Sequence, residues 1–207
     1  MSAPPLFVMP KNVLFSLGLP LAENTFYQLP HDKLIQQCVE RKEVVVNPAK
    51  QANGISHDVF IVKDKMTDNT VDWAHNQPVE EQFFDKLYRK MIAHLDGENI
   101  WIRDSYIDAD PADKLYIRSI SEDPESDLFV YSMFLHPTPK EIENFNPDWH
   151  IIHMPTFSVH QKTDGISQDK FAIINFTKRV VLIGGLAYDN EIKEIIFSVL
   201  NQLPAER

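Results

Sequence analysis

A pair of glycines followed by a tyrosine and a lysine is the pattern in this chain with the clearest chemical meaning. Gly184 and Gly185 end an apolar run and precede an amphipathic segment, with Tyr188 and Lys193 close behind. Where a strand leads into a helix, glycines let the backbone approach an anion, and the unpaired N–H groups of the first helical turn attract it. A plain tight turn is the commoner explanation of a glycine pair, and a solvent-facing position explains the other two residues. The pattern alone therefore leaves an anion site and a simple turn open.

Histidines and aspartates gather in two places without the spacing that a metal needs. His150 and His153 lie three residues apart in an expected strand, where side chains alternate between faces, so they cannot close on one ion with His160. The acidic run of residues 104–113 lacks the turn glycine and the terminal glutamate of an EF-hand, and we interpret its members as turn-forming and helix-capping residues. They are Asp104, Asp108, Asp110 and Asp113. We therefore expect no metal site.

No sequence motif marks a catalytic nucleophile either. No G-x-S-x-G segment occurs, and Ser56 beside His57 has no sequence context for a catalytic triad. The lone cysteine, Cys38, lies on the apolar face of a predicted helix, so we interpret it as a core residue. It cannot form an internal disulfide, which fits a reducing compartment.

Composition and charge limit the classes of partner that the chain is expected to bind. The 207 residues are 43% hydrophobic and 24% charged, as in soluble folded proteins, and the formal net charge is −10. A surface this acidic repels phosphate backbones and anionic lipids, so we expect no nucleic-acid and no membrane partner. The first ten residues have no basic segment followed by an apolar core, and no apolar run approaches the roughly 20 residues of a membrane span. We expect a cytoplasmic location.

The elements that would position these residues alternate between strand and helix patterns. Helices are predicted at 32–41, 78–94, 124–135, 139–145 and 191–203, the second with Pro78 in its first turn and the fourth opened by a capping box at Thr138 and Glu141. Short β-branched runs predict strands at 44–46, 59–62, 100–102, 115–117, 151–152, 171–176 and 180–183. The fold class is α/β, a mixed β-sheet flanked by helices. Residues 1–30 are interpreted as an irregular segment and 31–207 as one domain.

The glycine pair sits inside a longer ordered string. Asn175-Phe176, Arg179, Leu182-Ile183-Gly184-Gly185, Tyr188, Lys193, Phe197-Ser198, Asn201 and Leu203-Pro204 follow one another in that order. This string resembles the signature of ATP-dependent phosphoenolpyruvate carboxykinases. Shorter matches run in the same order, and the resemblance covers roughly residues 32–204. These matches are Asp64, Val71-Asp72-Trp73, Asn76-Gln77-Pro78, Asp104, Ala109-Asp110-Pro111, Phe134 to Pro137 and Asn146-Pro147-Asp148.

The resemblance implies a fold like the N-terminal domain of these enzymes, which convert oxaloacetate and ATP to phosphoenolpyruvate, CO2 and ADP in gluconeogenesis. In the family this domain binds oxaloacetate or phosphoenolpyruvate, and a following domain holds ATP and Mg²⁺ or Mn²⁺ on a phosphate-binding loop. No G-x-x-x-x-G-K-[ST] segment occurs in these 207 residues. We therefore expect no cofactor for this chain alone, and no catalysis by it alone.

Several family positions are altered. The resemblance implies that Tyr188 and Lys193 are remnants of a substrate site, whereas Ile55 stands where the family has an arginine that grips the substrate carboxylate. Leu186 replaces a threonine, Glu194 replaces a lysine that contributes to the metal site, and His136 replaces an arginine. Isoleucine cannot make a charge-assisted bidentate hydrogen bond. We expect a degenerate site without catalytic residues.

Two hypotheses of different classes follow. The first is a catalytically degenerate, stand-alone carboxykinase-like domain that acts as a binding or interaction module. The second is a fragment or split subunit of a carboxykinase that needs a separate nucleotide-binding half. In either case we expect a small carboxylate as a ligand, and a second copy or a separate protein as the partner on the face that the nucleotide-binding domain covers in the family.

Overall fold

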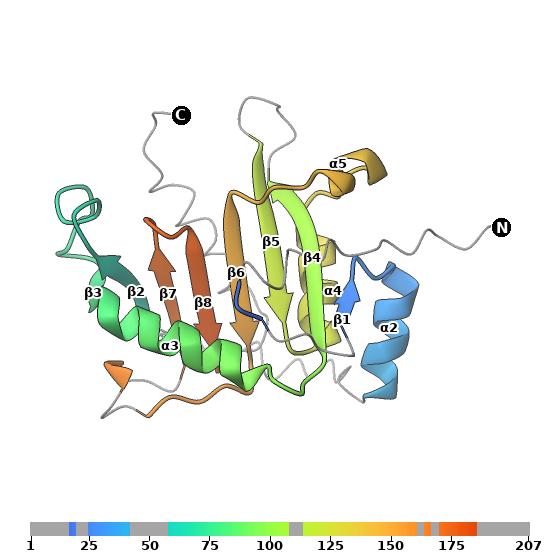
Figure 1. Cartoon of the computed structure of the whole chain (residues 1–207), viewed down its shortest axis with the longest axis horizontal. Helices are drawn as coiled ribbons and strands as arrows, with labels where there is room; N and C mark the ends of the chain where they lie inside the picture. The colour runs from blue at the N-terminus through green and yellow to red at the C-terminus, as the bar shows by residue number, and fades with distance from the viewer. Residues whose placement is uncertain are drawn as a thin grey trace.

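One mixed sheet organises the structure. The computed structural model describes residues 17–19, 25–41, 58–107, 114–160, 164–166 and 170–185. Within them eight strands form a sheet in the order β1-β4-β5-β6-β8-β7-β2-β3 (Figure 1). The strands are β1 Thr25–Tyr27, β2 Asp58–Lys63, β3 Gln77–Glu80, β4 Ile100–Ile107, β5 Leu115–Ser121, β6 Trp149–Met154, β7 Phe171–Asn175 and β8 Val180–Gly184.

Both strand directions occur in this sheet. β4 with β5 and β7 with β8 pair antiparallel, whereas the other five neighbouring pairs are parallel. Its strands are apolar and mostly buried on both faces, as expected for a sheet covered by helices on each side. The predicted fold class, a mixed sheet flanked by helices, is confirmed.

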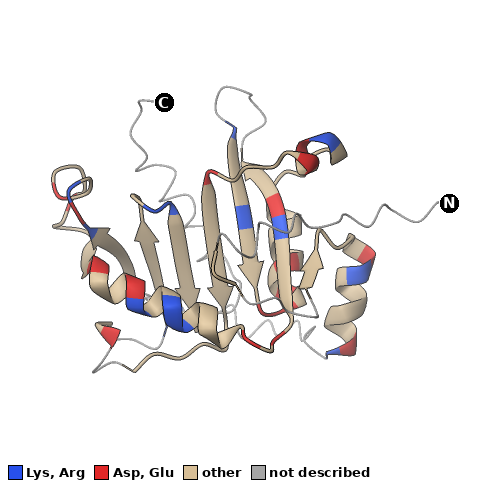
Figure 2. Cartoon of the chain, viewed as in Figure 1, with Lys and Arg blue, Asp and Glu red and all other residues tan. Residues whose placement is uncertain are grey.

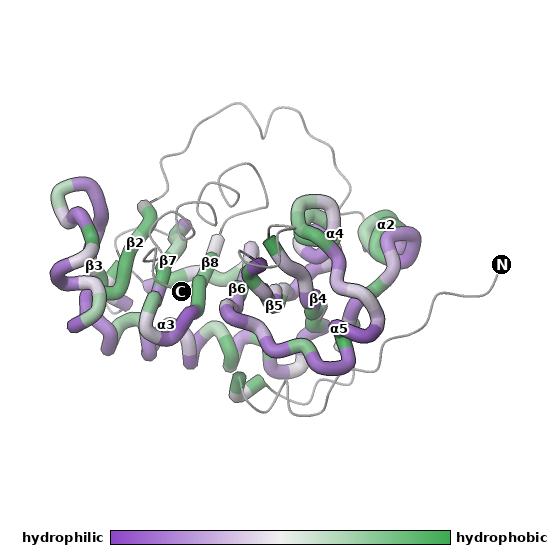
Figure 3. Tube along the Cα trace, turned by 90° about the horizontal axis from the view of Figure 1, so that it is seen from above, coloured by the Kyte–Doolittle hydropathy of each residue, from purple (hydrophilic) through white to green (hydrophobic). Residues whose placement is uncertain are grey.

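Helices cover the two faces. α3 (Glu81–His94) crosses one face, and α4 (Pro124–Met133) and α2 (His31–Glu40) lie on the other, as Figure 3 shows from above. Successive residues of a strand therefore enter different cores: Ile152 packs in the cluster that contains Phe84 and Leu87 of α3, whereas Ile151 packs in the cluster that contains Val130 of α4. The short α5 (Pro139–Glu143) follows α4 and begins with the predicted capping box of Thr138 and Glu141.

Two predicted features need correction at the N-terminal half. The helix expected from Pro78 begins only at Glu81, because residues 77–80 form β3 and pair with β2. Pro78 has no N–H to donate, which an edge strand tolerates as well as a first helical turn does. β1 was not among the predicted strands, and it pairs with β4 through Thr25, Phe26 and Tyr27.

Other predicted elements match or fall outside the described residues. The helices expected at 32–41, 124–135 and 139–145 are present; the first lies one residue earlier, and the other two end two residues earlier than expected. Cys38 is completely buried, as predicted. The strand expected at 44–46 and the helix expected at 191–203 lie outside the described residues. No helix among the described residues is both long and apolar enough to span a bilayer.

Candidate functional site

The glycine pair lies at an edge where four strands begin or end. Gly184 pairs with Phe171 at the start of β7 and with Met154 at the end of β6. Phe171 in turn pairs with Asp58, the first residue of β2. The chain thus enters β2 and β7 and leaves β6 and β8 at one edge of the sheet. Ligands of open α/β sheets commonly bind outside the carboxyl ends of strands, so this edge is the candidate site.

The backbone at this edge requires glycine at both positions. A Cβ on Gly184 would stand 2.5 Å from the ring of Phe171, closer than side chains tolerate. Gly185 has φ of 69°, a left-handed conformation that glycine adopts without strain, and its N–H donates to the Met154 carbonyl at 3.1 Å. Gly185 thus continues the pairing of β8 with β6, and both the turn interpretation and the ligand interpretation of the glycine pair depend on residues that lie outside the described ranges.

Two polar side chains are fixed beside this edge. Glu122, which follows β5, is buried; its Oε1 accepts from the Thr156 N–H at 2.5 Å, and its Oε2 lies 2.9 Å from Nε2 of His94. His94 closes α3 and packs its ring edge-on against Phe157. This arrangement ties the end of α3 to the ends of β5 and β6, and it holds a carboxylate and an imidazole within proton-transfer distance.

A second buried polar chain lies under α4. The Asp123 carboxylate caps α4 by accepting from the Ser126 N–H at 2.7 Å, and it also accepts from the Ser126 hydroxyl at 2.6 Å. The same hydroxyl lies 3.0 Å from Nδ1 of His153, which is completely buried. An aspartate at the N-cap satisfies N–H groups that a helix start leaves unpaired, so these contacts explain the local fold without a catalytic role.

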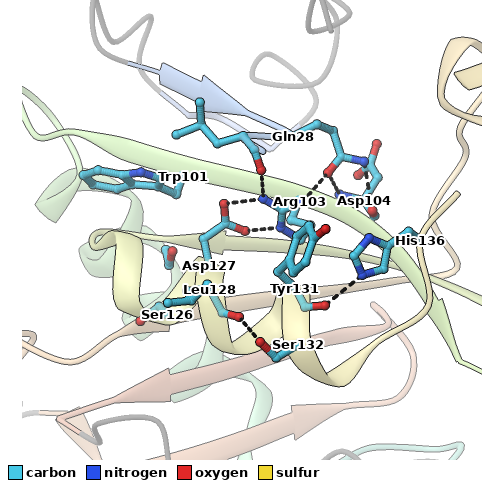
Figure 4. A network of polar contacts seen from close by, with 12 residues as sticks. Gln28, Trp101, Arg103, Asp104, Ser126, Asp127, Leu128, Tyr131, Ser132 and His136 are labelled. Atoms are coloured by element: carbon cyan, nitrogen blue, oxygen red, sulfur yellow. Dashed lines mark hydrogen bonds and ion pairs between the residues drawn. The ribbon is translucent and has the colours of Figure 1, made fainter. Parts of the chain in front are cut away.

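Charged residues in the middle of β4 and β5 belong to a further buried network (Figure 2). Arg103 of β4 makes a bidentate pair with Asp127 of α4, with N–O distances of 2.5 and 2.9 Å. It also donates to the Leu29 carbonyl at 2.7 Å and to the Gln28 side chain at 3.4 Å, and its guanidinium lies over the Tyr131 ring (Figure 4). Burial raises the pKa of the Asp127 carboxyl, although Arg103 opposes this shift.

The neighbouring residue, Asp104, faces the other side of the sheet. Its carboxylate accepts from Arg118 at 2.6 and 2.7 Å and from the Tyr27 hydroxyl at 2.6 Å. Burial and the Asp104 charge raise the pKa of Tyr27 well above its usual range, so the hydroxyl stays protonated and donates. The interpretation of Asp104 as a turn or capping residue was wrong, because it pairs with an arginine inside a strand; Asp108, Asp110 and Asp113 lie outside the described residues.

The predicted position of the histidines on opposite faces is confirmed. His153 reaches Ser126 of α4, whereas His150 lies on the other face, where burial and the charge of Arg118 lower its pKa to about 4. Within the described ranges, no group of three or more His, Cys, Asp or Glu side chains is placed to hold a metal ion.

Of the six family positions named as remnants or as altered, only His136 falls within the described residues. His136 follows α4; its Nε2 donates to the Tyr131 carbonyl at 2.8 Å, and its ring packs edge-on against the Tyr131 ring. Leu135 beside it pairs with Tyr106 near the end of β4, so His136 lies at the sheet end opposite Gly184. Tyr188, Lys193, Ile55, Leu186 and Glu194 lie outside the described residues.

The sequence interpretation missed Arg103, Arg118 and Asp127 as a buried network. A signal was present, because Arg103 and Arg118 each interrupt an apolar strand run, and a charged residue in a buried strand needs a partner. The partner itself is not marked by local spacing, since Asp127 is separated from Arg103 by a strand and a turn.

Comparisons with known proteins give matches over most of this chain. The phosphoenolpyruvate carboxykinase family model matches residues 21–207. The chain is 37% identical over 208 residues to a phosphoenolpyruvate carboxykinase (ATP) of Flavobacterium johnsoniae, covering 93% of this chain and 39% of the relative. It is 40% identical over 176 residues to a phosphoenolpyruvate carboxykinase (ATP) of Christiangramia forsetii, a match that covers 83% of this chain and 33% of that relative. The chain therefore spans between a third and two fifths of the length of these curated relatives.

Proposed function

Because this chain belongs to the phosphoenolpyruvate carboxykinase family, we propose that it forms the substrate-binding side of the carboxykinase fold with weakened substrate contacts, and that it acts as a binding module. Its ligand is a small carboxylate with a second anionic group, either the second carboxylate of oxaloacetate or the phosphate of phosphoenolpyruvate. It does not turn this ligand over by itself.

The observation that carries this proposal is the strand register at the glycine edge. Asp58, Phe171 and Gly184 are successive neighbours across three strands. The segment that ends at residue 57 contains Ile55, and the segment that begins at residue 186 contains Tyr188 and Lys193. The chain therefore enters β2 after residue 57 and leaves β8 after residue 185 at the same edge of the sheet, with β7 between these two points, and the proposal is that a carboxylate meets residues of both segments there.

Residue chemistry explains why binding should be weak. Lys193 and Tyr188 retain a cation and a hydroxyl that an anion can use, but Ile55 removes the arginine that the family resemblance implies. Asp189 and Glu194 add negative charge close to the same segment. A dianionic ligand would thus lose one charge-assisted contact and meet two repulsive groups.

Calorimetric titration with phosphoenolpyruvate tests the proposal. We expect weak binding to the wild-type chain and a tenfold to hundredfold gain, about 1.5–3 kcal/mol, on Ile55→Arg. Ile55→Gln is the matched control, because it adds polarity of similar length without charge and should give little gain. Equal affinity of all three proteins, or no binding to any of them, would remove the substrate-site proposal.

A second candidate function follows from the share of the relatives that the chain covers, 39% of the Flavobacterium johnsoniae enzyme. In this reading the chain is the substrate-side part of an active carboxykinase, and the nucleotide-binding part is supplied with it or by another chain. Mixing the chain with the remaining part of that relative, in the presence of oxaloacetate, ATP and Mn²⁺, discriminates between the two. Formation of phosphoenolpyruvate only in the mixture would favour the subunit, whereas no turnover in either sample favours the module.

Partner binding is part of the same proposal. In the family this domain packs against the nucleotide-binding domain, so we propose that the same face of this chain meets a second copy or a separate protein. Light scattering after gel filtration over a concentration series, with pull-down from the native cytoplasm, tests this. A species that stays monomeric and retrieves no protein would contradict it.

A further inference from the structure

A cavity between β4 and α4 lies apart from the glycine edge. Its volume is about 170 Å³. Buried residues of β4 and α4 form its floor, and the exposed Leu135 and His136 stand at its mouth. The whole lining is Gln28, Leu29, Pro30, Arg103, Asp104, Ser105, Val130, Tyr131, Phe134, Leu135, His136 and Pro137.

An unpartnered hydroxyl belongs to the floor. Ser105 is 2% exposed, and its Oγ has no hydrogen-bond partner. Because strand side chains alternate, Ser105 points to the same face of β4 as Arg103, the face that α4 covers and on which the cavity lies. A buried hydroxyl without a partner costs free energy, so its position at the floor of a cavity indicates a group that a ligand completes.

The floor offers donors rather than acceptors. Asp104 lines the cavity, but its carboxylate lies on the other face of the sheet, where Arg118 and Tyr27 engage it. Asp127 does not line the cavity, and both of its oxygens pair with Arg103. Arg103 makes four hydrogen bonds, two to Asp127 and one each to Leu29 and Gln28. A guanidinium carries five N–H donors, so one donor on Nη1 remains. An anionic oxygen suits this floor better than an ammonium group.

The walls are apolar. Val130, Phe134 and Leu135 contribute aliphatic and aromatic surface. The rings of Tyr131 and His136, which pack edge-on against each other, also line the cavity (Figure 4). A cavity of about 150 Å³ accommodates a ligand of six heavy atoms such as benzene. The 170 Å³ here therefore suits a ligand of about six heavy atoms with a polar head and a short apolar body.

We propose that this cavity binds a short-chain monocarboxylate of about four carbons, with the carboxylate hydrogen-bonded to Ser105 and its alkyl part against Val130 and Leu135. This site is distinct from the glycine edge. Ser105 pairs with Ile117, whereas the edge lies beyond Ser121, four residues further along β5 or about 13 Å. The two sites also sit on different elements.

Titration with isobutyrate, observed by NMR on the full chain, tests the proposal. We expect a Kd on the order of 1 mM, which is within the affinity open to six heavy atoms. We also expect nuclear Overhauser contacts from the isobutyrate methyl groups to the side chains of Val130 and Leu135. Isobutyramide has the same shape without the charge and should bind more weakly.

Two serine variants supply a matched comparison. Ser105→Ala should weaken isobutyrate binding about tenfold, the loss of one hydrogen bond to a charged group. Ser119→Ala is the control, because Ser119 is also buried with an unpartnered Oγ but does not line the cavity. Its affinity should equal that of the wild type, and neither variant removes a hydrogen bond from the apo fold.

Three outcomes would overturn the proposal. One is no isobutyrate binding, or contacts only to residues outside the cavity. Another is equal loss of affinity in both serine variants, which would indicate a general effect on the sheet. The third is equal affinity for isobutyramide, which would contradict the carboxylate assignment.

Discussion

Removing the carboxylate of Asp127 should strongly destabilise the fold. The side chains of Arg103 and Asp127 are only 7% and 2% exposed, and they form a bidentate pair between β4 and α4. Asp127→Ala leaves the guanidinium buried without its anion. It then keeps two hydrogen bonds, to Leu29 and Gln28, which cannot balance a full charge.

The size of the expected loss in unfolding free energy follows from the burial of this ion pair. Breaking a buried ion pair by removing one partner costs about 3–5 kcal/mol, and we expect about 3 because two hydrogen bonds remain. Replacing both partners, Arg103→Met with Asp127→Ala, removes the uncompensated charge and should cost less than Asp127→Ala alone. The exposed pair of Lys63 and Asp68, with side chains 50% and 54% exposed, provides the control. Asp68→Ala should change stability by less than about 1 kcal/mol.

Urea unfolding at neutral pH, followed by tryptophan fluorescence, measures these free energies by linear extrapolation. The comparison of the single and double variants isolates the coupling between Arg103 and Asp127. A loss below about 1 kcal/mol for Asp127→Ala, similar to that of Asp68→Ala, would refute the reasoning that burial makes this pair structurally important. A double variant less stable than the sum of the single losses would also refute it.

Three further predictions concern stability. The pKa of His150 is lowered from 6.5 to about 4, so the unfolded state binds the proton first as pH falls. About 3 kcal/mol of stability should therefore be lost between these two pH values, and the loss should then level off, as measured by urea titrations at each pH. His150→Gln should remove this loss, and the exposed His75→Gln should not. Gly184→Ala should cost about 1–3 kcal/mol in urea unfolding, because its Cβ would meet Phe171. Thr138→Ala should cost about 1 kcal/mol in the same assay through loss of the capping box.

Much of the fold was predictable from apolar periodicity. The buried stripe of α3, with Phe84, Leu87 and Met91, follows helical spacing, and the opposite faces of His150 and His153 follow from strand alternation. These features depend on neighbours in sequence, so a single sequence contains them.

Features set by distant pairing were not predictable in the same way. Pro78 suits both a first helical turn and an edge strand, and only pairing with β2 decides between them. β1 has three residues, too few to show the alternation of apolar and polar side chains that marks a strand. The cavity beside Ser105 arises where β4, α4 and residues 28–30 meet, and no local pattern marks such a meeting. At the glycine edge, the sequence predicted that a strand ends at the glycine pair. Its alignment with β7 and, through β7, with β2 depends on pairing between distant segments, which the sequence does not show.

The central claim, that a weakened substrate site lies at the glycine edge, is tested most directly by amide chemical-shift mapping of the Ile55→Arg variant with phosphoenolpyruvate. The account predicts the largest shifts at the N–H groups of Phe171, Gly184 and Gly185, with smaller shifts of the same amides in the wild type at the same ligand concentration. Shifts confined to the opposite end of the sheet, around Tyr106 and Leu135, or no shifts in either protein, would contradict it.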